Sequence, residues 1–353
     1  MSAGASPVPA MSGTGYASCH HGEILQGVFL DARGRRCAAL VTLPLTGLGT
    51  RADAVLRPGA GPGCHSVDPP DRTKALRAAA LALRECRARR PQSALGGLEL
   101  RLSGDVPLGL GMGSSSSDVI AAVRAVADAC GLRLPSRTVA RIAVRAERAS
   151  DPLMLDGRPL LFAQREGRVL EVLGDALPPA VVVGCALGGG RPVDTLSLPV
   201  PAYGDDDVRA YERLRALLRR AVTEGDTQLL GHVSTESARR AQRVLRHREF
   251  DRLTRVAGRT GAVGVQIAHS GSVAGLIFDP AAPDLEARLR RCVRALNHEA
   301  IPVTRTFTTS TTSTTSTTSS TTSEESRHGR AHRRRDRPAR PDTPGRRARL
   351  SAL

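Results

Sequence analysis

The sequence predicts an α+β protein made of two halves, and three observations support this prediction. In GLELRLSGDVP (97–107), leucines alternate with polar residues, which is typical of a half-buried strand. Helical patterns flank this strand at 71–90, which is rich in Ala, Leu and Arg, and from about 116 to 129, which is closed by a glycine. After a buried strand at 180–187, the second half has the order helix, helix, strand, strand, helix, strand, as in an α+β layer.

The other expected elements follow from the same kinds of pattern. Glycine turns divide the first part of the chain into short strand-like runs, and REG lies at the turn of a predicted hairpin. The expected elements are short strands over 15–58, a helix over 136–148, a hairpin over 160–173, a buried strand over 180–187, two or three helices over 206–259, two strands over 261–280, a helix over 283–297 and a strand over 301–307.

The charge is strongly positive, but its pattern does not favour a nucleic-acid surface. The net charge is +17, yet lysine occurs only once, at Lys74, so almost all of it is arginine. Ten arginines against four acids lie in the Thr/Ser-rich and then Arg-rich segment 307–353, which is predicted to be disordered. Motifs of RNA-binding aromatic residues and zinc-finger spacings are absent from the sequence. A solvated basic surface is therefore preferred, and an Arg-rich nucleic-acid-binding protein remains the alternative from another class.

The cysteines and the hydropathy pattern indicate a reduced compartment. The seven cysteines are scattered without a CxxC pair, which argues against a zinc or dithiol site. We see neither an apolar signal segment nor a run of 18 apolar residues. The expectation is a soluble, cytoplasmic protein without a membrane partner.

The stretch PLGLGMGSSSS (107–117) lies between the predicted strand and a predicted helix, where a phosphate cradle would be built. Glycines allow backbone N–H groups to turn toward an anion, and the helix start adds unpaired N–H groups. Serine hydroxyls can donate to phosphate or join a Mg²⁺ shell. The alternative is an ordinary glycine turn with a serine helix cap. The stretch fits neither GxxxxGK[ST] nor GxGxxG.

Three motifs together resemble the GHMP kinases. PLGLGMGSSSSDVIAAVRA is similar to their second motif, P-x3-G-L-G-S-S-A-A. YASCHHGEILQGVF (16–29) resembles the first motif, and GAVGVQIAHSGSVAGLIF (261–278) resembles the third. Within the family, the wording of SCHHGEILQG and AHSGSVAGLIF most resembles the L-threonine kinases of propanediol utilisation and cobamide synthesis. The resemblance covers about residues 14–306.

The resemblance implies a fold and a division of the chain. It implies a two-domain GHMP kinase fold, with a half like ribosomal protein S5 domain 2 and then a ferredoxin-like half, and ATP between them. The expected division is a disordered N-terminus over 1–13, an ATP-binding domain over 14–177, a C-terminal domain over 178–306 and the disordered tail over 307–353.

The resemblance also assigns roles to residues. Asp151 and Glu147 are the expected catalytic residues, and Ser115 with Glu147 is the expected Mg²⁺ site. The alternatives are a surface pairing of Glu147 with Arg145 or Arg148, and a plain loop acid at Asp151. Whether Asp151 acts as a base or orients the hydroxyl stays open. The expected ATP-binding residues are Pro107, Gly109, Gly111, Gly113, Ser114, Ser115 and Ser116, the expected acceptor-binding residues are His20, His21, Glu23, His269 and Ser270, and Arg191 and Asp194 are further candidates in a later loop.

The function implied is transfer of the γ-phosphate of ATP, with Mg²⁺, to the side-chain hydroxyl of a small amino acid. L-threonine is the first candidate acceptor. Homoserine or a sugar-like alcohol is the alternative within the family. In the first motif, Glu23 and the two histidines offer groups that suit an ammonium and a carboxylate.

Overall fold

The structure is a computed structural model, and it describes most of residues 11–309, which belong to one compact unit. Within that range the structure leaves out short segments at 58–60, 62, 91–95, 105, 107–110, 156–157, 191–201 and 270–271. The predicted disordered ends overlap the described part slightly, because the first strand begins at Met11 and the last ends at Thr308. Residues 1–10 and 310–353 lie outside the described residues.

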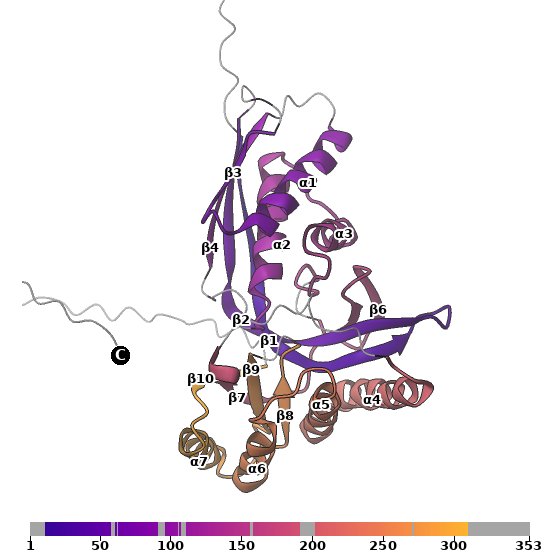
Figure 1. Cartoon of the computed structure of the whole chain (residues 1–353), viewed down its shortest axis with the longest axis vertical. Coiled ribbons are helices and arrows are strands. Elements are labelled where there is room, and N and C mark those ends of the chain that lie inside the picture. The colour runs from indigo at the N-terminus through magenta and orange to yellow at the C-terminus, as the bar shows by residue number, and fades with distance from the viewer. Residues whose placement is uncertain are drawn as a thin grey trace, which may run out of the picture. The chain divides into compact units, whose positions relative to one another are not determined.

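Two long antiparallel strands run through both halves of the sheet. They are β1 (Met11–Leu30) and β2 (Arg36–Arg57), which the sequence analysis had divided at glycines into shorter runs. The glycines lie inside β1 because a helix crosses it closely. A Cβ at Gly13 or Gly15 would lie 2.1 or 2.2 Å from the backbone of that helix, so only glycine fits. In Figure 1 the indigo strands run along one layer and then turn across the next.

The first half has three helices, of which the first two pack against strands of this sheet and the third packs against those two helices. They are α1 (Thr73–Arg89), α2 (Ser114–Ala129) and α3 (Ser136–Glu147), and the strands beside β2 are β4 (Gly97–Gly104) and β3 (His65–Asp68). Their core is rich in alanine, which allows helix and sheet to approach closely. Strands β5 (Leu160–Ala163) and β6 (Arg168–Val172) form the hairpin that the REG turn predicts, and β5 pairs with β2.

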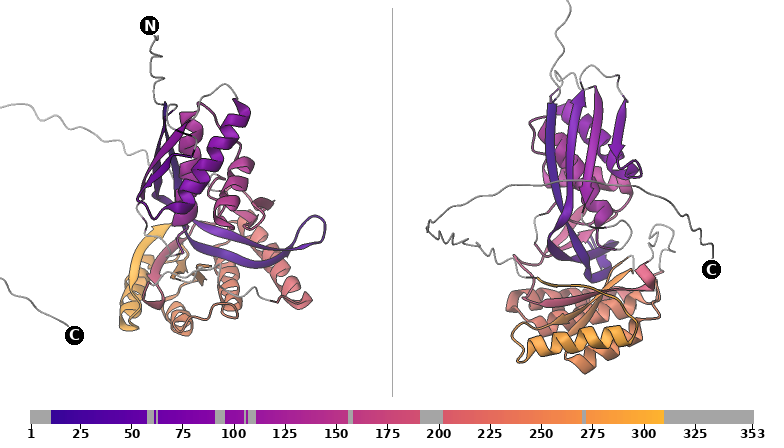
Figure 2. Two further views of the ribbon diagram at one scale, coloured as in Figure 1. Left: turned by 45° about the horizontal axis from the view of Figure 1, so that its top comes forward. Right: turned by 90° about the vertical axis from the view of Figure 1, so that its left-hand side faces the viewer.

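In the second half, four strands carry four helices. The strands are β7 (Val181–Ala186), β8 (Gly264–Ile267), β9 (Val273–Phe278) and β10 (Val303–Thr308), in the order β10-β7-β9-β8, and β8 pairs with β1. Figure 2, right, shows the helices of this half below its strands. They are α4 (Asp205–Glu224), α5 (Thr227–Ala241), α6 (Phe250–Thr260) and α7 (Leu285–His298). No helix in the described ranges has both the length and the apolar character needed to cross a bilayer.

Strand β1 joins two hydrophobic cores. Ala17 belongs to the Ala-rich core of the first half. Ile24, Leu25 and Phe29 belong to a second core, which also holds buried residues from β7 and from α4. The stretch between these cores, His20–Glu23, contains shifts in the β1–β2 register. Such irregularities re-aim side chains, and this is where the candidate site lies.

Candidate active site

The start of α2 is fixed against β1 by a glycine turn. Gly111 and Gly113 have φ values of 73° and 68°. A Cβ on Gly113 would lie 2.3 Å from the His20 ring, so both its conformation and its surroundings require glycine. The His20 N–H donates to the carbonyl of Met112 at 3.1 Å. The first and second motifs are therefore in direct contact. Pro107 and Gly109 lie outside the described residues.

Two serines of α2 bind the last residue of α3. The hydroxyls of Ser115 and Ser116 donate to the two carboxylate oxygens of Glu147, at 3.0 and 2.9 Å. Glu147 is 5% exposed, and burial together with the nearby Asp151 raises its pKa to about 7. No arginine or lysine of the described chain pairs with it, so it is not a surface partner of its neighbours. This all-oxygen group at a helix start is suited to a divalent cation.

Asp151 lies beside this group and pairs with His20. Its N–H donates to the Ser116 hydroxyl at 3.1 Å, and its carboxylate lies 3.0 Å from His20 Nε2. Burial alone would lower the pKa of His20, but the Asp151 and Glu23 carboxylates raise it to about 9. Burial favours neutral Asp151, but protonated His20 keeps its pKa below the usual range. The pair is therefore an imidazolium and a carboxylate at neutral pH, with the Asp151 side chain 23% exposed.

Glu23 is the third titratable side chain of this cluster. One of its oxygens lies 3.9 Å from His20 Nδ1, and the other accepts a short hydrogen bond from the N–H of His269. Burial raises the pKa of Glu23 to about 8. Ligand atoms of His20, Glu23 and Asp151 lie within 4.8 Å of one another, but the close approach of His20 to Asp151 is that of an ion pair.

The third motif reaches the same place from β8. Nδ1 of His269 lies 2.9 Å from Oε1 of Gln26, and the Gln26 amide donates to the carbonyl of Ile267 at 3.1 Å. Gln26 was not singled out in the sequence, although it belongs to the first motif. Ser270, Arg191 and Asp194 lie outside the described residues.

The His21 side chain, which was expected to bind the acceptor, lies away from this cluster. Its ring is buried, its Nδ1 lies 3.2 Å from Oε1 of Gln266, and it packs against Phe307 at a centroid distance of 5.0 Å. Burial lowers its pKa to about 4, so the ring is neutral. His21 is a core residue between strands.

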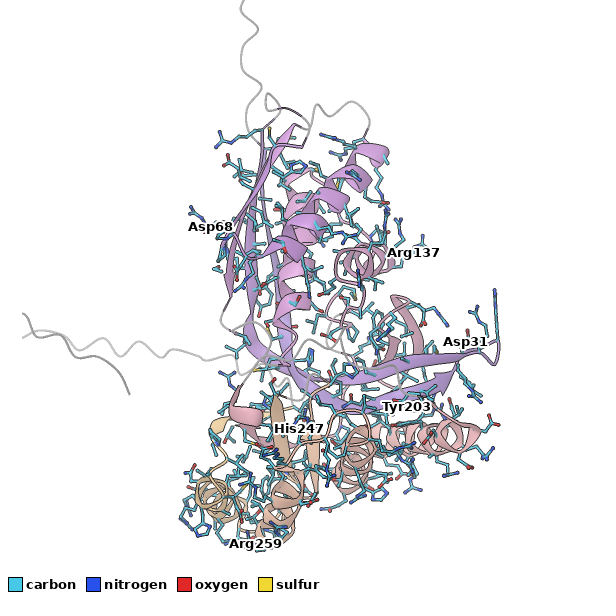
Figure 3. All side chains as sticks on the ribbon, viewed as in Figure 1. Asp31, Asp68, Arg137, Tyr203, His247 and Arg259 are labelled. Atoms are coloured by element: carbon cyan, nitrogen blue, oxygen red, sulfur yellow. The ribbon has the colours of Figure 1, made fainter. Side chains whose placement is uncertain are left out.

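A cavity of about 370 Å³ opens beside His269 and Gln26. Figure 3 labels two of its other lining residues, Tyr203 and His247, which lie below the β1–β2 hairpin. No aspartate or glutamate is among the described residues that line it. The lining residues are Gln26, Gly27, Val28, Arg36, Cys37, Ala38, Gln164, Arg165, Tyr203, Tyr211, Ala241, Gln242, Val244, Leu245, His247, Ile267, Ala268 and His269.

Comparison with known proteins agrees with this arrangement. Residues 74–154 match the family model for the GHMP kinases N terminal domain. The chain carries a GHMP kinase N-terminal domain. That segment contains α2, Glu147 and Asp151, which are the residues that meet in the site.

One curated relative is the L-threonine kinase of Citrobacter freundii. It is 26% identical over 183 residues, which is 52% of this chain and 62% of that protein. The alignment thus spans less than two thirds of the relative.

Solved structures show that the whole described part has the GHMP kinase fold. The homoserine kinase from Cytophaga hutchinsonii gives a TM-score of 0.59 at 15% identity, over 88% of this chain and 97% of that one. Mevalonate kinase of L. major in complex with R-mevalonate gives 0.53 at 16% identity, over 86% and 97%. MDDEF in complex with MVAPP, AMPPCP and magnesium gives 0.58 at 15% identity, over 85% and 97%. The α+β fold expected from the sequence is confirmed.

Proposed function

We propose that this protein transfers the γ-phosphate of ATP to the side-chain hydroxyl of a small amino acid, with L-threonine as the first candidate. The observation that carries the proposal is that one serine, Ser116, hydrogen-bonds with two acidic residues of the site. Ser116 binds both Glu147, on the nucleotide side, and the backbone of Asp151, on the acceptor side. Phosphoryl transfer needs this kind of fixed positioning more than it needs covalent chemistry.

The nucleotide side is the start of α2. The N-cap residue is Gly113, which has no side chain to cover the N–H groups of the first helical turn. Those groups and the positive end of the helix dipole suit the phosphates of ATP. In this proposal Gly111, Gly113, Ser114, Ser115 and Ser116 hold the triphosphate.

Ser115 and Glu147 would hold Mg²⁺. The donors fit, because Mg²⁺ prefers oxygen ligands and the buried Glu147 has no positive partner within the described chain. When bound, the ion would neutralise charge on the transferred phosphoryl group.

Asp151 would orient the acceptor hydroxyl by accepting its hydrogen bond. Protonated His20 holds Asp151 in its ionised form and in one orientation. Because the pKa of Asp151 is low, it is a weak base, and orientation is its main contribution. A loose transfer step does not require a stronger base.

An acceptor panel with an active-site variant tests the proposal. We expect ADP release with L-threonine, compared with L-serine, L-homoserine and simple sugars. Asp151→Asn should lower kcat on the order of 10²-fold with little change in ATP affinity. The matched control is Asp175→Asn, because Asp175 is an exposed acid outside the site. Wild-type turnover in Asp151→Asn, or no ATP binding by the wild type with Mg²⁺, would contradict the proposal. If the enzyme prefers another alcohol, the kinase activity is supported and L-threonine is excluded as its main acceptor.

A further inference from the structure

The turn between β5 and β6 brings Gln164 and Arg165 to the cavity beside His269. We infer that these two adjacent residues bind the zwitterionic head group of the acceptor. Gln164 Oε1 accepts from the ammonium group, and the Arg165 guanidinium pairs with the carboxylate. The inference rests on the proposed function, and it assigns the recognition of an α-amino acid to residues outside the three sequence motifs.

Gln164 has an unused acceptor in a buried place. Its side chain is 8% exposed, and its Oε1 has no hydrogen-bond partner in the described part of the chain. A buried polar atom without a partner costs free energy, so such atoms usually meet a water or a ligand. Gln164 also lines the cavity. Because this oxygen is closed to solvent, the Gln164 side chain would have to rotate toward the cavity, where an ammonium group would supply the missing donor.

Arg165 has an unused positive charge at the same place. Two arginines line the cavity, and Arg36 pairs with Asp205. Arg165 is exposed and has no carboxylate partner among the residues that the structure describes. Because the described lining holds no acid, nothing in the cavity competes with a ligand carboxylate. Arginine binds carboxylates through two parallel hydrogen bonds, which fixes orientation as well as charge.

The turn is attached to the catalytic segment. The carbonyl of Gln164 accepts a hydrogen bond from the N–H of Ser150 at 3.0 Å, and Ser150 directly precedes Asp151. Burial lowers the pKa of His269, Asp151 raises it and Arg165 lowers it further, so both charges act on one ring. A head group bound at the turn would thereby lie near Asp151. The acceptor needs this proximity, because its hydroxyl side chain is short.

Glu23 and His20 of the first motif are less free to bind the head group of the acceptor. Glu23 already accepts from the N–H of His269, and His20 is paired with Asp151. A head group bound there would break those contacts. On the β5–β6 turn it would complete contacts that are missing.

The test separates the two charges of the head group. The acceptors are L-threonine, L-threoninamide, which lacks the carboxylate, and 3-hydroxybutyrate, which lacks the ammonium group. Arg165→Ala should raise KM for L-threonine about 10- to 100-fold and leave KM for L-threoninamide unchanged. Arg165→Lys should restore part of the loss. The matched control is Arg137→Ala, which removes the same charge from α3, outside the cavity.

Gln164→Leu should narrow the preference of the enzyme for L-threonine over 3-hydroxybutyrate by a similar factor. Thermal unfolding shows whether this buried variant is folded, and Arg165→Ala tests the same inference at an exposed position. Equal losses with L-threonine and L-threoninamide in Arg165→Ala would overturn the inference. An unchanged preference in folded Gln164→Leu would overturn the ammonium contact. If wild-type protein binds MgATP but turns over none of these acceptors and accepts another alcohol, the amino-acid acceptor itself fails, whatever the variants do.

Discussion

Replacing Glu147 by glutamine should stabilise the unliganded protein and at the same time abolish most of its magnesium-dependent turnover. Glutamine keeps the shape of the side chain and can still hydrogen-bond with Ser115 and Ser116. It removes a negative charge that is buried beside Asp151 without a positive partner within the described chain. The free energy of unfolding should therefore rise.

The magnitude follows from the pKa. Burial and the Asp151 charge raise the pKa of Glu147 from its ordinary value of 4.5 to about 7. At about 1.4 kcal/mol per tenfold change in proton affinity, this corresponds to roughly 3 kcal/mol. The folded protein binds this proton more tightly than the unfolded chain, so the penalty is absent below pH 4.5, grows through the window from 4.5 to 7 and is complete above it. The difference in melting temperature between Glu147→Gln and the wild type should be small at pH 5 and reach roughly 5–10 °C at pH 8.

Thermal unfolding at pH 5 and pH 8, with and without Mg²⁺ and a non-hydrolysable ATP analogue, measures this effect. Mg²⁺ should stabilise the wild type and not Glu147→Gln, since binding to the folded state raises stability. The variant should lose on the order of 10²-fold in kcat. Glu166→Gln is the control, because Glu166 is exposed on the β5–β6 turn. A gain that is equal at both pH values, or absent at pH 8, would refute the reasoning.

Three further predictions concern the contacts around this site. Gly113→Ala should push the His20 ring aside and strain a positive φ, lowering stability by about 1–3 kcal/mol and reducing kcat; unfolding and turnover of the purified variant check this. His20→Gln should raise the pKa of Asp151, because protonated His20 lowers it. The acid limb of the kcat–pH profile should therefore move to higher pH. If the limb does not move, Asp151 is not the catalytic group that this limb reports. Removing residues 311–353 should leave activity and melting temperature unchanged, whereas removing 308–353 should lower the melting temperature, because Thr308 pairs with Val181 in the sheet.

The nucleotide side of the site was largely predictable from the sequence. The glycine turn, the serines and the two helices of the first half were found by local patterns, and the structure places Ser115 and Ser116 against Glu147. Local patterns located the serines at a helix start, whereas the roles of Ser115 and Glu147 came from the resemblance to the GHMP kinases.

The long strands and the sorting of the two histidines were harder to predict. The sequence analysis interpreted the glycines inside β1 as turns. Glycine is required there because α2 packs closely on the strand, and this contact joins residues that are far apart in the sequence. The sequence analysis treated His20 and His21 alike. Neighbouring residues of a strand point to opposite faces, so a continuous strand through this motif would have sent one ring to each face. His20 meets Asp151 and His21 enters the core.

Gln164 and Arg165 had no signal in the sequence beyond a polar hairpin turn. They stand out because, among the residues that the structure describes, the buried Gln164 oxygen has no hydrogen-bond partner and the Arg165 charge has no carboxylate partner. Only the tertiary arrangement reveals such gaps. The division of the chain at residues 177 and 178 remains a prediction.

The shared strand β1 has a consequence for how the protein opens. One continuous strand supplies Ala17 to the first core, His20 and Glu23 to the site, and Ile24 to the second core. Opening of either core along β1 would therefore disturb the strand that positions His20 and Glu23. The slowest amide hydrogen exchange should therefore occur in β1 on both sides of the irregular stretch His20–Glu23, and loss of activity on heating should coincide with unfolding of both halves.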